Sequence, residues 1–130
     1  IGSHTVLALK DAGRKAVVLD DLSAGHRSLV PDGVPLHVGS VGDGTLVRSL
    51  IRDHGVTSVL HFAGSVSVPE SMANPEKYYV NNTESTRALV ESCAAAGVRN
   101  FIFSSTAAVY GNNPARLVAE DATPDPQSPY

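Results

Sequence analysis

Apolar positions near the start of the chain follow first a helical and then a strand-like spacing. In residues 3–12 they recur at intervals typical of one helix face, and Gly13 follows where a helix would end. The run 15–20 is short and almost wholly apolar, which is typical of a parallel strand covered on both faces. A polar loop comes next. The pattern therefore predicts a helix followed by a buried strand.

The same alternation continues as far as Ala108. It predicts strands at 35–39, 57–63 and 100–105 and helices at 43–54 and 75–96, and a loop rich in Pro, Asn and Asp after Ala108. Nine residues are expected on the buried faces of the two helices: Leu46, Val47, Leu50, Ile51, Tyr79, Ala88, Leu89, Cys93 and Ala96.

Alternating strands and helices indicate an α/β fold, a Rossmann-type doubly wound parallel sheet with helices on both faces. In that fold the first strand lies at the centre of the sheet and leads through a glycine-rich turn into the first helix. This chain opens at that helix. We therefore expect an incomplete fold in which the first strand and the glycine loop are absent. The interior strand edges would lack partners, so residues 1–130 alone are not expected to fold stably.

Composition excludes several classes of function. The chain is 42% apolar and 18% charged, with a net charge of −3 and no run of Lys or Arg, which argues against nucleic acid as a partner. No apolar stretch reaches the roughly 20 residues of a membrane span. The single cysteine, Cys93, excludes a disulfide framework and is compatible with a cytoplasmic protein. The five histidines show no metal-ligand spacing, so no metal site is expected.

Gly2 and Asp20 have a spacing typical of dinucleotide binding. Such folds place a loop glycine at the start of the first helix and an acidic residue about 20 positions later, where it binds the adenosine ribose. A carboxylate there favours NAD over NADP because it repels a 2′-phosphate. By spacing alone, a solvated aspartate at a strand end is an equally good interpretation of Asp20.

Further candidate residues follow the later elements. Ala63 and Gly64 are small enough to let a ligand approach the backbone, although from the residues alone a tight turn is the better interpretation. Asn81 and Asn82 lie in a helical pattern that they disfavour. Such a local disagreement is typical of functional residues, although two exposed polar positions on a helix are the commoner case. Tyr130 could act as a base at neutral pH only with a cationic neighbour or strong hydrogen bonds, because a phenol has a pKa near 10, and nothing in the chain clearly supplies that cation.

Several strings occur together and in order. They are VVLDDLSAGHR (17–27), VLHFAGSVSVPES (59–71), KYYVNNT (77–83), FIFSSTAAVYG (101–111) and SPY (128–130), after an initial IGSHT. With them the chain resembles, over nearly its whole length, the UDP-glucose 4-epimerase family of the extended short-chain dehydrogenase/reductase superfamily. Sibling nucleotide-sugar dehydratases usually carry an acidic pair in place of Ala107-Ala108 and lack the HFAG-type strand end.

The resemblance implies a set of site residues. Thr106 would be the catalytic Ser/Thr, and Tyr130 would be the Tyr of the Tyr-x-x-x-Lys motif. The implied NAD-binding residues are Ile1, Gly2, Asp20, Asp21, Leu22, Ser23, Ala24, Gly25, Ser40, Val41, Phe62, Ala63, Gly64, Ser65, Val66, Asn81, Thr106 and Tyr130.

The resemblance also implies a reaction, 4-epimerisation of a UDP-hexose, which in galactose metabolism interconverts UDP-glucose and UDP-galactose. Hydride passes from C4 to NAD while Tyr130 removes the 4-hydroxyl proton, and the 4-keto sugar turns over and takes the hydride back on its other face. A homodimer is implied for the full-length protein. The alternatives are another NAD-dependent nucleotide-sugar dehydratase or decarboxylase, and a non-catalytic fragment.

Three features depart from the family pattern. Ser40 stands where many relatives have an aspartate that touches adenine, and Val66 stands where lysine is common. The motif's lysine would lie four positions after Tyr130, outside residues 1–130, as would the substrate domain. We therefore expect a chain truncated at both ends, an NAD-binding fragment that is inactive by itself.

Overall fold

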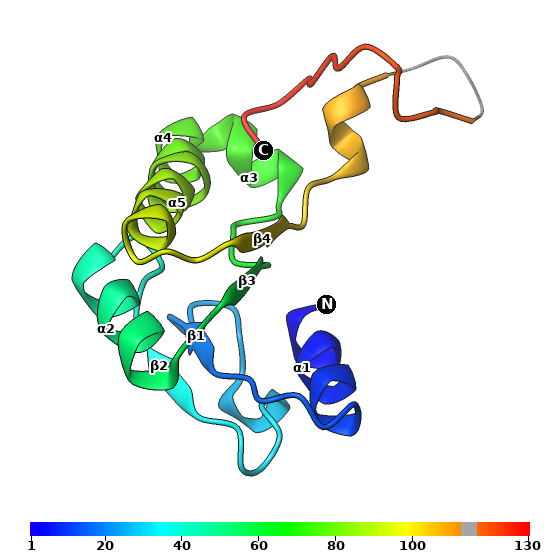
Figure 1. The fold of residues 1–130 in the computed structure, drawn as a ribbon. Coiled ribbons are helices and arrows are strands. Elements are labelled where there is room, and N and C mark those ends of the chain that lie inside the picture. The colour runs from blue at the N-terminus through cyan, green and yellow to red at the C-terminus, as the bar shows by residue number, and fades with distance from the viewer. Residues whose placement is uncertain (113–116) are drawn as a thin grey trace.

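The computed structural model describes residues 1–112 and 117–130. Its helices are α1 (Gly2–Asp11), α2 (Gly44–His54), α3 (Val68–Ala73), α4 (Pro75–Tyr78) and α5 (Ser85–Ala95), and its strands are β1 (Val18–Asp20), β2 (Leu36–Val38), β3 (Ser58–His61) and β4 (Asn100–Phe103) (Figure 1). Two 3₁₀ turns, η1 (Arg27–Leu29) and η3 (Ala107–Tyr110), and a π-helical segment, η2 (Tyr79–Glu84), complete the described elements. The predicted order of strands and helices is confirmed.

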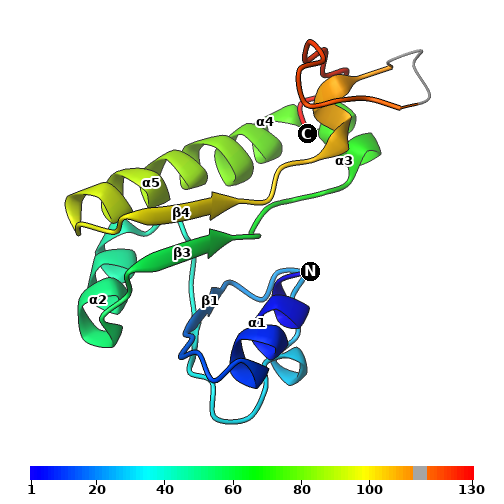
Figure 2. The ribbon, with the colours of Figure 1, turned by 45° about the vertical axis from the view of Figure 1, so that its right-hand side comes forward.

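The described strands form two parallel pairs rather than one sheet. β1 pairs with β2, with Leu19 opposite His37, and β3 pairs with β4, with Leu60 opposite Ile102. No described strand joins the two pairs, and a groove of about 1090 Å³ lies between β1 and β3. Figure 2 shows the β3–β4 pair lying beneath α5 and separated from β1 and α1. Parallel strands joined through helices confirm the Rossmann-type α/β class and its incomplete sheet.

Helix α2 is specified by its own sequence. The Asp43 carboxylate caps its first turn by accepting from the amides of Thr45 and Leu46 at 3.0 Å. Gly55 ends it with a left-handed φ of 60°, which glycine adopts without strain. Its predicted buried face is confirmed for Val47, Leu50 and Ile51, and Leu46 is half-buried.

The hydrophobic core lies between α2 and α5. Val47 and Ile51 pack against Leu89 and Cys93, as predicted for the buried sides of both helices. Six half-buried side chains surround this cluster: Leu19, Val41, Val56, Val59, Val98 and Phe101. Because β1, β3 and β4 each contribute to this set, the core holds the two strand pairs beside the helix layer.

The helix predicted at 75–96 is divided in the structure. α4 passes into the π-helical segment η2, and α5 follows. The wider π turn changes which residues face inward. Tyr79 is 55% exposed while Tyr78 is 1% exposed, so the expectation that Tyr79 is buried was wrong. Ala96 caps α5 and is also exposed, against expectation, because it lies beyond the last packed turn.

Other element boundaries differ from the prediction in detail. Helix α3 lies in a segment for which the sequence pattern predicted no element, and η3 replaces the start of the loop expected after Ala108. All four strands are shorter than their predicted runs, because only part of each run pairs with a neighbouring strand.

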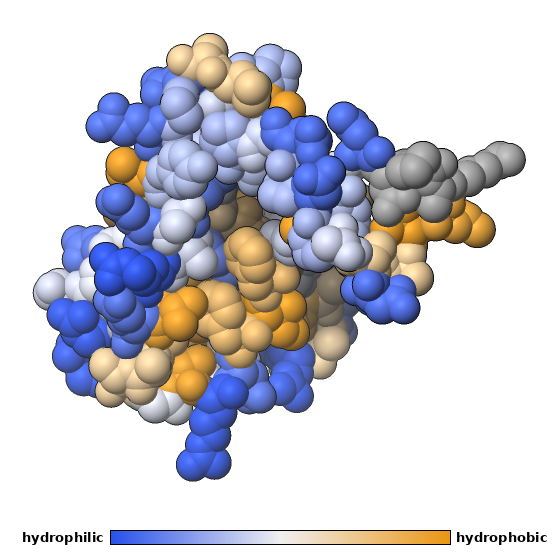
Figure 3. All heavy atoms as spheres, turned by 90° about the horizontal axis from the view of Figure 1, so that it is seen from above, coloured by the Kyte–Doolittle hydropathy of each residue, from blue (hydrophilic) through white to orange (hydrophobic). Residues whose placement is uncertain are grey.

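The molecule exposes more surface than a compact protein of its size. Its accessible area is 8891 Å², whereas a compact monomer of 13.6 kDa exposes about 6,600 Å². Apolar side chains accordingly remain on the surface, among them Leu60 and Ile102 on the face of the β3–β4 pair. Figure 3 shows apolar surface gathered among hydrophilic side chains on the face seen from above. None of the described helices combines the length and apolar content of a membrane span.

Candidate functional site

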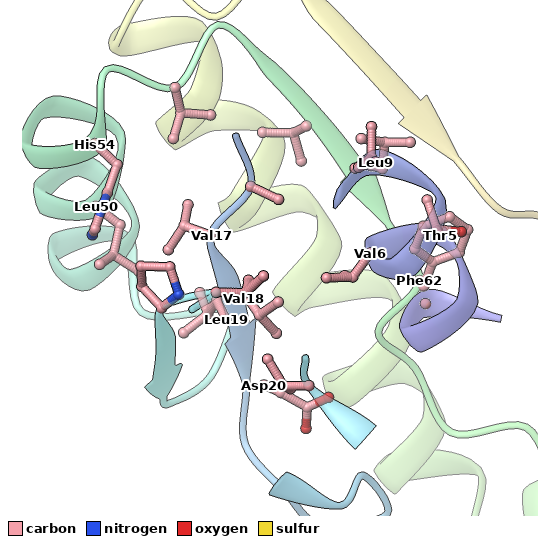
Figure 4. Close-up of a pocket in the computed structure, with 18 of the residues that line it drawn as sticks. Thr5, Val6, Leu9, Val17, Val18, Leu19, Asp20, Leu50, His54 and Phe62 are labelled. Atoms are coloured by element: carbon pink, nitrogen blue, oxygen red, sulfur yellow. The ribbon is translucent and has the colours of Figure 1, made fainter. Parts of the chain in front are cut away.

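The groove lies between β1 and β3, where the Rossmann-type strand order places the absent first strand, and predicted site residues from four segments stand along it. Its walls are largely apolar, with Val18 and Leu19 from β1, Leu50 from α2 and Val59 from β3. The groove is also lined by predicted cofactor residues, namely Gly2, Asp20, Gly25, Val41, Phe62 and Ala63. Figure 4 shows Asp20 at the end of β1 and Phe62 against α1. The groove therefore joins the start of α1 to the ends of β1 and β3.

The carboxylate of Asp20 is oriented by the turn that follows β1. One of its oxygens, Oδ1, accepts from the Leu22 amide at 2.8 Å, and the other accepts no hydrogen bond from the described residues. Gly25 lies directly against this carboxylate, since a Cβ built there would stand 2.8 Å from both oxygens. The glycine therefore leaves room for the carboxylate, and one Asp20 oxygen remains available to an external donor.

Residues 21–24 form a tight turn beside Asp20. Leu22 has a φ of 58°, a left-handed conformation that costs a leucine about 1 kcal/mol. The exposed carboxylate of Asp21 accepts from Ser23 Oγ at 2.6 Å and from the Ser23 amide at 2.9 Å. These two hydrogen bonds hold the pKa of Asp21 below its ordinary value. Asp21 is thus engaged inside the turn, and Ser23 and Ala24 are exposed.

The N-terminal end of α1 carries no side-chain cap. Ile1 occupies the cap position and is 85% exposed, and the first turn has no acidic residue. The positive end of a helix dipole with uncapped amides is a favourable place for a phosphate. Gly2 packs on the ring of Phe62, where an added Cβ would make an ordinary contact at 3.6 Å. The contact keeps the helix start close to the end of β3.

A second group of residues holds the loop 63–67, which joins β3 to α3. The Asn81 amide donates to Ser65 Oγ at 3.0 Å. Asn82 bonds the Ser65 backbone twice, accepting from its N–H at 2.8 Å and donating to its carbonyl at 2.9 Å. Both asparagines lie in the π-helical segment η2, where helix geometry is interrupted. Asn82 was a candidate because of its place in a helical pattern, but the NAD-binding set implied by the resemblance includes only Asn81.

The side chain of Asn82 approaches Gly64 closely. A Cβ on Gly64 would stand 3.3 Å from Asn82 Oδ1, nearer than most such contacts allow. Val66, two residues later, is 71% exposed. The loop is therefore held at Ser65, while the side chain of Val66 is directed outward.

Thr106 and Tyr130 follow the carboxyl ends of the strands. Thr106 caps η3, its Oγ1 accepting from the Ala108 amide at 3.1 Å, which leaves its hydroxyl proton free to be donated elsewhere. The half-buried Tyr130 ring meets Tyr78 edge-on, with centroids 6.5 Å apart and planes at 86°. Figure 2 shows the start of α1, the tips of β3 and β4 and the chain end on one side of the molecule.

Positions 40 and 41 differ from the other predicted residues in their roles. Ser40 is exposed, and its Oγ accepts from the Gly42 amide at 3.0 Å. Val41 is half-buried and packs against the core cluster as well as lining the groove. Ser40 therefore stabilises a turn, and Val41 contributes to both the groove and the core.

The only fully buried histidine among the described residues lies at the end of β3. His61 is 3% exposed, and its Nε2 lies 2.8 Å from Thr86 Oγ1. Burial lowers the pKa of His61, which favours the neutral imidazole. In the described part of the chain, no group of three or more His, Cys, Asp or Glu side chains is arranged to hold a metal ion.

Comparison with known proteins supports a family assignment. A family model described as "NAD dependent epimerase/dehydratase family" matches residues 1–130. The chain is 49% identical over 130 residues to a UDP-glucose 4-epimerase from Azospirillum brasilense, and it covers 37% of that protein.

Solved structures give the same result. UDP-glucose 4-epimerase from Brucella ovis in complex with NAD superposes with a TM-score of 0.95 at 36% identity, over 99% of this chain and 39% of that one. The Thermotoga maritima enzyme with UDP-glucose gives a TM-score of 0.92 at 31% identity, over 99% of this chain and 42% of that one. The chain thus spans about two fifths of the length of these relatives. It belongs to the NAD dependent epimerase/dehydratase family.

Proposed function

We propose that this chain is the NAD-binding part of an enzyme that interconverts UDP-glucose and UDP-galactose at C4. The observation that carries the proposal is the Asp20 carboxylate at the end of β1, with Gly25 beneath it and one oxygen free of described protein donors. The names of the relatives, and the NAD and UDP-glucose in two of their structures, support it.

The residues present fit a dinucleotide. Asp20 would accept from the adenosine ribose hydroxyls, and its charge would exclude a 2′-phosphate. The uncapped amides at the start of α1 would face the pyrophosphate, where Ile1 and Gly2 add no competing side-chain cap. Loop 63–67 would approach the cofactor through its backbone, since Ala63 and Gly64 present little side chain there.

NAD bound there would accept a hydride from C4 of the sugar and return it to the opposite face. The remaining steps fall to the chain's own side chains. Tyr130 would remove the proton of the 4-hydroxyl. The Thr106 hydroxyl would donate a hydrogen bond to the C4 oxygen, because its contact with the Ala108 amide does not use its proton. The Thr106 hydroxyl would thus hold the sugar oxygen by a hydrogen bond, and the phenolate form of Tyr130 would take its proton.

Tyr130 needs a cation to act near neutral pH, because an ordinary phenol titrates near 10. None of the hydrogen bonds or ion pairs of the described residues brings a Lys or Arg to its phenol. We therefore expect residues 1–130 by themselves to be inactive and the activity to belong to the full-length protein. A lysine four positions after Tyr130 would be the source of the charge.

Assembly is a further part of the proposal. Val80 and Val90, on η2 and α5, are 48% and 44% exposed. A second copy packed along this helix would cover them, as in a homodimer of the full-length protein. Light scattering of the full-length protein measures its mass directly, and a monomeric mass would remove this part of the proposal.

The catalytic proposal is tested with full-length protein incubated with UDP-galactose and no added NAD. Formation of UDP-glucose by wild type, and its loss in Tyr130→Phe, would support the function. A 4-keto-6-deoxy or decarboxylated product would instead identify a dehydratase or decarboxylase of the same family. If UDP-galactose is recovered unchanged, the protein lacks the epimerase activity and the proposal is wrong.

A further inference from the structure

Tyr78 is the most deeply buried aromatic side chain among the described residues, and both ends of it are fixed. Its ring is 1% exposed. Its hydroxyl donates to Glu70 Oε2 at 2.8 Å and accepts from the Ser67 amide at 2.9 Å. Lys77 pairs with the other oxygen of the same carboxylate. Since its hydroxyl is held from two directions and its ring is enclosed, Tyr78 has little freedom to move.

This fixed ring and the ring of Tyr130 meet edge to face. The centroids lie 6.5 Å apart with the planes at 86°, the edge-to-face arrangement that aromatic pairs prefer. Tyr130 ends the described segment 117–130, whose residues form neither a helix nor a strand. The orientation of its ring therefore depends on what it packs against, and Tyr78 supplies a rigid surface for it.

The same side chain also anchors the loop 63–67. Tyr78 holds the amide of Ser67, and Asn82, four residues later, holds the backbone of Ser65. One short stretch of chain, α4 and η2, thus fixes the loop proposed to approach the cofactor and supports the tyrosine proposed to meet the sugar.

We propose that Tyr78 is a positioning residue that sets the orientation of the Tyr130 phenol relative to the loop 63–67. The proposal rests on the proposed function, in which Tyr130 removes the sugar proton. Tyr78 itself is unsuited to proton transfer, since its pKa is raised, mainly by burial and to a smaller extent by the hydrogen bond to Glu70. It acts through Tyr130.

The test uses the full-length protein and three variants. Tyr78→Leu removes the aromatic ring, and Tyr78→Phe keeps the ring but not the hydroxyl. Tyr79→Leu alters the neighbouring exposed tyrosine and is the matched control. The kcat and KM for UDP-galactose are measured as functions of pH. The titration of Tyr130 is followed separately by NMR of ¹³C-labelled tyrosine.

We expect Tyr78→Leu to lower kcat about tenfold or more with little change in KM, since a small misplacement of a reacting group is costly. Its pH profile and the Tyr130 titration should shift together. Tyr78→Phe should restore most of kcat, and Tyr79→Leu should resemble wild type. If Tyr78→Leu does not fold, Tyr78→Met takes its place. Methionine refills most of the space without an aromatic ring, and its kcat, pH profile and Tyr130 titration are compared with wild type in the same way.

An unchanged kcat, pH profile and Tyr130 titration in a folded Tyr78→Leu or Tyr78→Met protein would overturn the proposal. So would a Tyr78→Phe variant as impaired as Tyr78→Leu, because the ring would then not be the determinant. If the wild-type protein shows no epimerase activity, the proposed function fails. The NMR titration then still decides whether Tyr78 orients Tyr130.

Discussion

The side-chain amide of Asn82 pairs with the backbone of Ser65 as a neighbouring strand would. Its Oδ1 accepts from the Ser65 N–H at 2.8 Å, and its Nδ2 donates to the Ser65 carbonyl at 2.9 Å. The two residues are 17 positions apart, so the pair fixes the loop after β3 to the π-helical segment η2. A loop held in this way can present its backbone to a ligand without rearranging.

The first prediction concerns this pair. In full-length protein, Asn82→Asp keeps the acceptor for the Ser65 N–H but turns a second oxygen toward the Ser65 carbonyl. We expect a loss of about 1–3 kcal/mol of stability, measured by denaturant unfolding, and weaker retention of NAD. The exposed Asn112→Asp is the matched control. Equal stability and NAD content in both variants would show that the pair contributes little.

The second prediction concerns the contribution of Asp20 to NAD binding. Asp20→Asn can still accept from the Leu22 amide but loses the charge that favours ribose hydroxyls. We expect affinity for NAD to fall roughly 10- to 100-fold, with discrimination against NADP reduced. Titration calorimetry of apo protein with each dinucleotide measures both. The exposed Asp11→Asn, outside the groove, should bind as wild type, and an Asp20→Asn protein that did so too would exclude Asp20 from the site.

Gly25 offers an independent test of the same carboxylate. In Gly25→Ala the new Cβ would meet both Asp20 oxygens, and the carboxylate can move aside at small cost because it is the end of a side chain. We expect weaker NAD binding with little change in melting temperature. A strongly lowered melting temperature would mean that the glycine serves the fold, and unaltered NAD binding would mean that its contact with Asp20 is incidental.

The pH dependence of stability should reflect His61. Burial lowers its pKa below the ordinary 6.5, so under mildly acidic conditions the unfolded chain takes up a proton that the folded chain does not. The free energy of unfolding should therefore decrease as the pH falls through and below 6.5. In His61→Gln this part of the decrease should vanish, whereas it should persist in the exposed His26→Gln. Parallel curves for wild type and His61→Gln would contradict the assignment.

Residues 1–130 by themselves should unfold without a sharp transition. Their accessible surface is 8891 Å², against about 6,600 Å² for a compact protein of this mass, and two-stranded sheets are marginal in water. Circular dichroism during heating should show a gradual loss of helical signal, whereas the full-length protein should melt cooperatively. A cooperative melt of the 130-residue chain would contradict this prediction, because it would show that its hydrophobic core is sufficient for stable folding.

Local signals allowed most of the fold to be predicted from sequence. Helix α2 is an example, since Asp43, its apolar positions and Gly55 lie within one stretch of chain. Helix α3 also carries a local signal in its sequence, although no element was predicted there. Ser67 accepts from the Glu70 amide at 3.3 Å, and the S-x-x-E pattern with a proline in the first turn is typical of a helix start.

Features that depend on distant contacts were not predictable in the same way. The π-helical segment reflects the pairing of Asn82 with Ser65, and the burial of Tyr78 instead of Tyr79 reflects hydrogen bonds to Ser67 and Glu70. The spacing of Gly2 and Asp20 indicated a dinucleotide site but could not reveal Gly25 against the carboxylate. The roles of Thr106 and Tyr130 came from family resemblance, and they remain proposals.

The central claim is that Asp20 and the start of α1 hold one tightly bound NAD in the full-length protein. The most direct measurement is to denature purified full-length protein and to identify and quantify the dinucleotide released by chromatography. The account predicts NAD in an amount close to that of the protein, and a sharply reduced amount from Asp20→Asn. Release of NADP instead, or of no dinucleotide from a wild-type protein that also fails to bind added NAD, would contradict it.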